Sequence, residues 1–111
     1  IIHSSKDLTN EIESMITSAE IPYKRGIHWT TDAGYRETWG QVMDYRDKGA
    51  LCVEMEGVGL FTIANYRKCV ATGIYVVSDV YSENDWKLGW EGNDIKRAVG
   101  AVIDMIIESI R

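Results

Sequence analysis

The fold class is decided by residues 50–68, which read ALCVEMEGVGLFTIANYRK. Ala50 to Val53 form an apolar run of strand length, and Met55 to Lys68 carry apolar residues around most of a helical circumference. A helix that is apolar on nearly all sides is expected to be largely buried. The stretch therefore predicts a short buried strand that leads directly into a buried helix.

The same alternation of helical and strand patterns continues on both sides of this stretch. Apolar positions from Leu8 to Ala19 recur at helical spacing, with Ser4 or Ser5 as the cap of that helix. The further expected elements are a strand over 23–31, a helix over 37–48 ended by Gly49, a strand over 70–78, an irregular segment over 81–92 and a helix over 93–110. Helices that alternate with short apolar strands predict an α/β layer structure with a mainly parallel sheet.

Two polar clusters follow the predicted strands. Glu54, Met55 and Glu56 follow one strand, and Ser78 and Asp79 end the next long one. Ligands of such sheets bind beyond the carboxyl ends of the strands, so Glu56 and Asp79 are expected to face one cleft. Simpler readings are open for each residue: the two glutamates suit the first turn of a helix, Met55 suits a core and Asp79 suits a turn.

The composition is that of an ordinary globular domain. The 111 residues suffice for one domain, and 45% hydrophobic with 26% charged residues argues against disorder. The net charge of −5 repels phosphate backbones, so no nucleic-acid partner is expected. The apolar runs are too short to predict a membrane span.

The cysteines and histidines give no sign of a metal site. Cys52 and Cys69 each lie in an apolar run, which predicts two small buried thiols in a reducing compartment, taken to be the cytoplasm. His3 and His28 do not stand at metal-ligand spacing to a cysteine or to each other.

Three stretches resemble the nucleoside phosphorylase family, which includes hexameric purine nucleoside phosphorylases, uridine phosphorylases and methylthioadenosine nucleosidases. They are GIHWTTDAGYRET at 26–38, VEME at 53–56 followed by the apolar helix, and VVSD at 76–79. Their order and spacing are similar to the family pattern along nearly the whole chain, and VEME is the most specific of the three.

The resemblance implies a role for each motif. Cleavage of an N-glycosidic bond passes through an oxocarbenium-like ribose, and one carboxylate can accept hydrogen bonds from two vicinal hydroxyls. Glu56 matches the family's ribose clamp, Met55 the residue against the sugar face, and Asp79 the acid that protonates a departing purine. Glu54 and Ser78 belong to the same motifs and are likewise expected to bind the substrate. The implied activity is pentosyl transfer from a nucleoside to inorganic phosphate, with no cofactor.

The resemblance and the apolar residues together predict a homo-oligomer. The family forms oligomers built from dimers. Trp86, Trp90 and the exposed part of the helix after Met55 are more apolar surface than so short a chain can easily cover. We expect self-association through this surface.

Departures from the family pattern concern the base. Gly34 stands where the family often has an aromatic residue that stacks on the base, so stacking falls to Tyr35, to a residue outside this chain, or to none. Thr38 and Gly40 stand where uridine phosphorylases carry a Gln and an Arg that read uracil. Together with Asp79 this favours a purine, although residues 29–38 resemble microbial sequences grouped with uridine phosphorylases, and the base is left open.

Family members are considerably longer at the N-terminus, where they carry a phosphate loop and phosphate-binding arginines. We therefore expect residues 1–111 to be the C-terminal part of a three-layer phosphorylase domain that lacks the N-terminal phosphate-binding part and is inactive alone. Two other readings stay open. One is a nucleosidase that uses water in place of phosphate, and the other is a non-catalytic domain that binds nucleosides or a partner chain.

Overall fold

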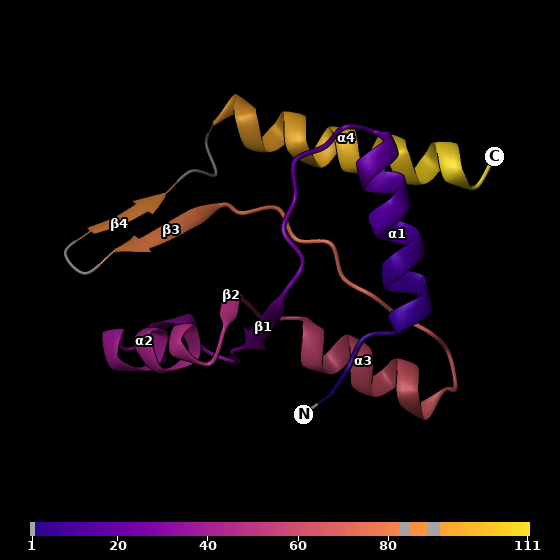
Figure 1. Ribbon diagram of the computed structural model, residues 1–111. Coiled ribbons are helices and arrows are strands. Elements are labelled where there is room, and N and C mark those ends of the chain that lie inside the picture. Colours follow the sequence, from indigo (N-terminus) through magenta and orange to yellow (C-terminus); the bar gives the residue numbers. More distant parts are fainter. Residues whose placement is uncertain (1, 83–84, 89–91) are drawn as a thin grey trace. The chain divides into compact units, whose positions relative to one another are not determined.

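The computed structural model describes residues 2–82, 85–88 and 92–111. Contacts between residues divide the chain into two units, Ile1–Thr9 with Lys24–Gly73 and Asn10–Tyr23 with Ile74–Arg111. The elements of Figure 1 are α1 (Lys6–Ser18), β1 (Ile27–Thr30), the 3-10 turn η1 (Gly34–Arg36), α2 (Trp39–Asp47), β2 (Ala50–Glu54), α3 (Gly57–Tyr66), β3 (Asp79–Ser82), β4 (Asp85–Leu88) and α4 (Asn93–Ser109).

The first unit is organised around a parallel pair of strands, β1 and β2. His28 lies opposite Cys52, Trp29 opposite Val53 and Thr30 opposite Glu54. Side chains alternate between the two faces of a strand, so His28 and Thr30 share one face. This face also holds the side chain of Glu54, because that carboxylate bonds to both residues. The register therefore assembles three polar side chains at the end of β2.

Helix α2 connects the two strands and has a well-defined start and end. A capping box joins Thr38 and Gln41: the Thr38 hydroxyl accepts the Gln41 N–H, and the Gln41 side chain accepts the Thr38 N–H. The helix ends before Gly49, which has a φ of 89° as the sequence predicts for a glycine after a helix. Trp29 of β1 stacks on Tyr45 of α2, with ring centroids 4.4 Å apart. This stacking holds the helix against the strand pair.

The second unit contains the antiparallel pair β3 and β4 and the helix α4. Asp79 pairs with Leu88 and Ser82 with Asp85. In the same unit the Tyr23 hydroxyl donates to Glu13 at 2.9 Å, which ties the segment after α1 back to that helix. The expected helix over 93–110 is confirmed as α4 within one residue.

Two sequence expectations about strands are wrong. Residues 70–78 were expected to form a strand, yet they join no ladder among the described residues, and the expected irregular segment over 81–92 contains β4 and the end of β3. A strand exists only where a neighbour takes its backbone hydrogen bonds. Strand β3 forms because its backbone pairs with that of β4. In the segment over 70–78, by contrast, the Ala71 carbonyl accepts the Ser5 N–H at 2.7 Å, and Ser5 belongs to no strand. Among the described residues the strands form one parallel and one antiparallel pair, a mixed helix and strand arrangement with a parallel sheet that is consistent with the expected α/β class.

The expectation of a largely buried α3 is also wrong. Only Gly57 and Phe61 of α3 are buried, whereas Val58 and Ile63 are 50% and 64% exposed. The helix contacts β1 on one side, where the His28 ring meets Phe61 edge-on at 6.0 Å. Most of the other apolar residues of α3 are exposed.

The thiols differ from their expectation as well. Both cysteines are free, Cys52 is half-buried, and Cys69 is exposed rather than buried. Lys68 has a φ of 56°, and the Cys69 N–H returns to the Ala64 carbonyl at 2.8 Å. Cys69 thus follows a residue in the left-handed conformation at the end of α3.

No helix of the described chain combines the length and hydropathy that crossing a membrane requires.

Candidate functional site

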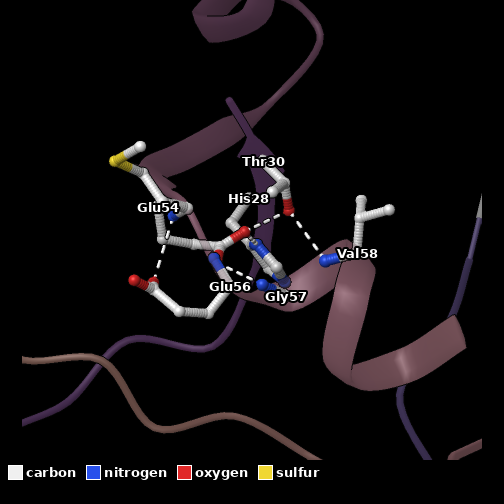
Figure 2. A network of polar contacts seen from close by, with 7 residues as sticks. His28, Thr30, Glu54, Glu56, Gly57 and Val58 are labelled. Atoms are coloured by element: carbon white, nitrogen blue, oxygen red, sulfur yellow. Dashed lines mark hydrogen bonds and ion pairs between the residues drawn. The ribbon is translucent and has the colours of Figure 1, made fainter. Parts of the chain in front are cut away.

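The candidate site is built on the turn between β2 and α3. This turn contains Met55 and Glu56, the two residues between the last residue of the strand and the first of the helix. Glu54 ends β2 and is the only charged residue that is buried among the described ones, with 9% of its surface exposed. Figure 2 shows its carboxylate surrounded by groups from β1 and from the start of α3.

Four hydrogen bonds reach the two oxygens of Glu54. On Oε1 it receives the Thr30 hydroxyl and Nδ1 of His28, the latter at 2.9 Å. On Oε2 it receives the backbone N–H groups of Glu56 at 2.7 Å and Gly57 at 2.5 Å. An ionised carboxylate only accepts, so Nδ1 of His28 carries the hydrogen in this pair. Two bonds per oxygen fill the accepting capacity of the carboxylate.

Thr30 and Glu54 together cap α3 from outside the helix. The first N–H groups of a helix have no partner within it. Here Glu54 takes those of Glu56 and Gly57, and the Thr30 hydroxyl accepts the Val58 N–H at 3.1 Å. A negative charge at this end is also favoured by the helix dipole. Three of the N–H groups that could bind a phosphate at this helix start are therefore occupied by the protein itself.

Gly57 permits this close approach of helix and strand. A Cβ at this position would lie 2.7 Å from Oε1 of Glu54 and 2.7 Å from Cε1 of His28. Contacts this short do not occur between real side chains. The start of α3 can therefore reach the Glu54 carboxylate only because residue 57 has no side chain.

The environment of Glu54 favours its ionised form. Burial by itself would raise the pKa of Glu54, but the hydrogen bonds from Thr30, Gly57, Glu56 and His28 outweigh it and lower the pKa below its ordinary value. The same negative charge, after the larger effect of burial, raises the pKa of the Cys52 thiol. Glu54 is thus a fixed negative charge beneath the turn.

Met55 and Glu56 face outward from the same turn. Met55 is 56% exposed, and Glu56 is exposed as well. Among the described residues, the carboxylate of Glu56 receives one hydrogen bond, from the Met55 N–H to Oε2 at 3.1 Å. Glu56 therefore keeps accepting capacity that Glu54 has already used. The roles of Met55 and Glu56 in binding a substrate stay predictions.

The other predicted site residues lie elsewhere in the chain. Ser78 and Asp79 adjoin each other at the start of β3 in the second unit, and the Ser78 hydroxyl donates to Oδ1 of Asp79 at 2.7 Å. Tyr35 lies in η1 of the first unit with 90% of its surface exposed. The structure therefore brings Glu54, at the end of β2, together with Met55 and Glu56 on the turn that follows it, and pairs Ser78 with Asp79. A shared cleft for Glu56 and Asp79 stays a prediction.

His28, Thr30 and Gly57 are members of the site that sequence reasoning did not single out. The sequence contains part of the information, because His28 and Thr30 are two residues apart in the predicted strand and so lie on the same face of it. Only the parallel register, which sets Thr30 opposite Glu54, shows that this face meets the carboxylate.

In the described part of the chain, no group of three or more His, Cys, Asp or Glu side chains is placed to hold a metal ion.

Comparison with known proteins assigns the chain to a family. The model of the phosphorylase superfamily matches residues 1–108, which is nearly the whole chain. The chain belongs to the phosphorylase superfamily. The resemblance seen in the three sequence motifs is thereby confirmed, and the turn carrying Met55 and Glu56 lies within the matched region of a superfamily member.

Two curated relatives are purine nucleoside phosphorylases of the DeoD type. One, from Exiguobacterium sp. strain AT1b, is 34% identical over 73 residues, which are 66% of this chain and 31% of the relative. The other, from Exiguobacterium sibiricum, is 33% identical over 76 residues, which are 68% of this chain and 32% of the relative. This superfamily member therefore matches about a third of the length of each relative. No solved structure matches it significantly.

Proposed function

We propose that the protein is a nucleoside phosphorylase that transfers the pentosyl group of a purine nucleoside to inorganic phosphate. One observation carries the proposal. In a member of the phosphorylase superfamily, the turn after β2 presents an exposed carboxylate, Glu56, while the carboxylate beneath it is fully bonded within the protein. An open carboxylate on a fixed turn suits the binding of two vicinal ribose hydroxyls.

The remaining residues take complementary roles in this proposal. The thioether of Met55 packs on the sugar face, and Tyr35, which is almost fully exposed, stacks on the base. Asp79 donates a proton to the departing purine, and the Ser78 hydroxyl fixes one of its carboxylate oxygens. Two points favour a purine over uracil as the base: the acid Asp79, which can protonate a purine, and the two curated relatives, which are purine nucleoside phosphorylases.

The proposed reaction breaks one bond and forms one. A phosphate oxygen attacks the anomeric carbon of the ribose, and the electron pair of the N-glycosidic bond moves to the base nitrogen. Protonation of the base by Asp79 makes it a better leaving group. The products are a ribose 1-phosphate and the free base. The N–H groups of Glu56, Gly57 and Val58 at the start of α3 are already bonded within the protein, so phosphate is expected to bind to other residues.

We also propose that the protein self-associates in a reducing cytoplasm. The exposed apolar side chains of α3, among them Val58, Leu60 and Ile63, form a surface that monomers rarely leave open. Trp90, expected to share this surface, and the side chain of Trp86 lie outside what the structure describes. The two free cysteines are compatible with a reducing compartment.

The reaction is tested with the protein as its gene encodes it. Inosine, adenosine and uridine are incubated with the protein, with and without phosphate, and ribose 1-phosphate and free ribose are measured separately. We expect ribose 1-phosphate from a purine nucleoside, formed only when phosphate is present. Free ribose at the same rate without phosphate would show a nucleosidase instead. No product with any of the three nucleosides would refute the proposed activity.

A further inference from the structure

We propose that Glu54 is a positioning residue, which sets the ribose preference of the site through Glu56 without touching the substrate. This inference rests on the proposed function, because it concerns how the same site recognises a ribose. It also separates two glutamates that the sequence motif alone places together.

The first step in the argument is the saturation of the Glu54 carboxylate. Each of its oxygens already accepts two hydrogen bonds, and the residue is buried. A ribose hydroxyl would have to displace one of these donors and leave it unbonded in a buried place, which is unfavourable. Glu54 therefore has no free position for a direct bond to the sugar.

The second step is what those bonds hold. Oε2 of Glu54 binds the N–H groups of Glu56 and Gly57, and so fixes the backbone from which the Glu56 side chain departs. Oε1 binds Thr30, and Thr30 in turn accepts the Val58 N–H. As Figure 2 shows, β1, β2 and the start of α3 are joined at this one carboxylate.

The third step connects this turn to ligand recognition. Glu56 is exposed and can shift with its backbone, so the place of its carboxylate depends on the turn beneath it. Two hydroxyls on neighbouring carbons are bound well only by an acceptor held in one place, because preorganisation reduces the loss of freedom on binding. Loss of the Glu54 bonds should therefore weaken ribosides more than 2′-deoxyribosides, as loss of Glu56 itself should.

The experiment compares Glu54→Gln, Glu56→Gln and the double variant in the protein as its gene encodes it. The measured quantity is the ratio of kcat/KM for inosine to that for 2′-deoxyinosine. In Glu54→Gln one accepting oxygen becomes an amide that donates, and we expect the ratio to fall roughly tenfold or more. In the Glu56→Gln background, the same change should lower the ratio no further, because Glu54 acts through Glu56. A further fall in the double variant would show that Glu54 contacts the sugar directly and would overturn the proposal.

A second pair of variants covers the case in which Glu54→Gln does not fold. Thr30→Val removes the hydroxyl that joins Glu54 to Val58, whereas the matched control Thr30→Ser keeps it. We expect Thr30→Val to lower the inosine preference several-fold and Thr30→Ser to retain it. Equal ratios in the two variants would count against positioning by this network.

Hydrogen exchange of the peptide covering residues 54–60 separates this inference from the proposed function, because it needs no substrate. We expect faster exchange at Glu56, Gly57 and Val58 in Glu54→Gln than in the unaltered protein. Unchanged exchange, in a protein that does cleave nucleosides, would refute the positioning role alone. An unaltered protein that cleaves no nucleoside would refute the proposed function, and with it the ribose role, whatever the exchange shows.

Discussion

The backbone N–H of Glu56 donates to the carboxylate of Glu54 at 2.7 Å, so one acidic residue of the motif holds the backbone of the other. The two side chains differ in burial and in hydrogen bonding. Glu54 is buried and accepts four hydrogen bonds, whereas Glu56 is exposed and accepts one among the described residues. The protein itself thus uses the accepting capacity of the inner carboxylate, whereas the outer carboxylate keeps most of its own.

The lowered pKa of Glu54 makes the stability of the turn depend on pH. A carboxyl group whose pKa is lower in the folded than in the unfolded protein stabilises the fold above the unfolded value, about 4.3 for Glu. That stabilisation is lost as the pH falls through the folded pKa, which lies below this value. We expect thermal unfolding measured between pH 7 and pH 3 to show a loss of stability at the acid end. The loss should be smaller in Glu54→Gln, and a variant with the same acid dependence as the unaltered protein would contradict this role.

Glu56→Gln should change substrate preference without changing the fold. The charged acceptor of the ribose hydroxyls is expected to contribute about 1.5–3 kcal/mol to riboside recognition. Measured kcat/KM should therefore fall much more for ribosides than for 2′-deoxyribosides, with an unchanged circular dichroism spectrum. Equal losses for both kinds of sugar would remove Glu56 from the ribose role.

Asp79→Asn should slow the cleavage of natural purine nucleosides by about 10²–10⁴-fold, the usual range for general acid catalysis. Asparagine keeps the shape of the side chain but cannot give up a proton to the base. A nucleoside whose leaving group needs no proton serves as the control, and its cleavage should be much less affected. Equal rate losses for both substrates would leave Asp79 with a structural or orienting role.

Gly57→Ala and Gly59→Ala form a matched pair within α3. The added Cβ at residue 57 meets Glu54 and His28 at 2.7 Å, whereas at residue 59 it meets nothing within 4 Å. Overpacking of this kind typically costs about 1–3 kcal/mol. Alanine at an open helical position is instead favoured over glycine by about 0.5–1 kcal/mol. Denaturant unfolding should therefore show Gly57→Ala destabilised and Gly59→Ala unchanged or stabilised, and similar stabilities would mean that Gly57 is not closely packed.

Local sequence patterns predicted several elements well because their causes lie within a few residues. Apolar spacing over 93–110 predicts α4, and Gly49 predicts the end of α2 since only local backbone conformation is involved. The VEME motif likewise placed Met55 and Glu56 directly after a strand, where the structure has them. The prediction of a strand over 70–78 was wrong because a strand forms only beside a partner segment, and the sequence of residues 70–78 does not indicate which segment that partner is.

The sequence by itself determined the family and the residues of the turn, because the VEME motif and its spacing to the other motifs are properties of the chain alone. The different environments of Glu54 and Glu56 were decided only by the tertiary structure. The motif matches Glu56 to the ribose clamp of the family, but it does not indicate which of the two glutamates is buried. The parallel register sets Thr30 opposite Glu54, and Gly57 lets the start of α3 approach the same carboxylate. Burial and hydrogen bonding depend on which groups meet in space, so two like residues in one motif acquired different environments only when β1, β2 and α3 came together.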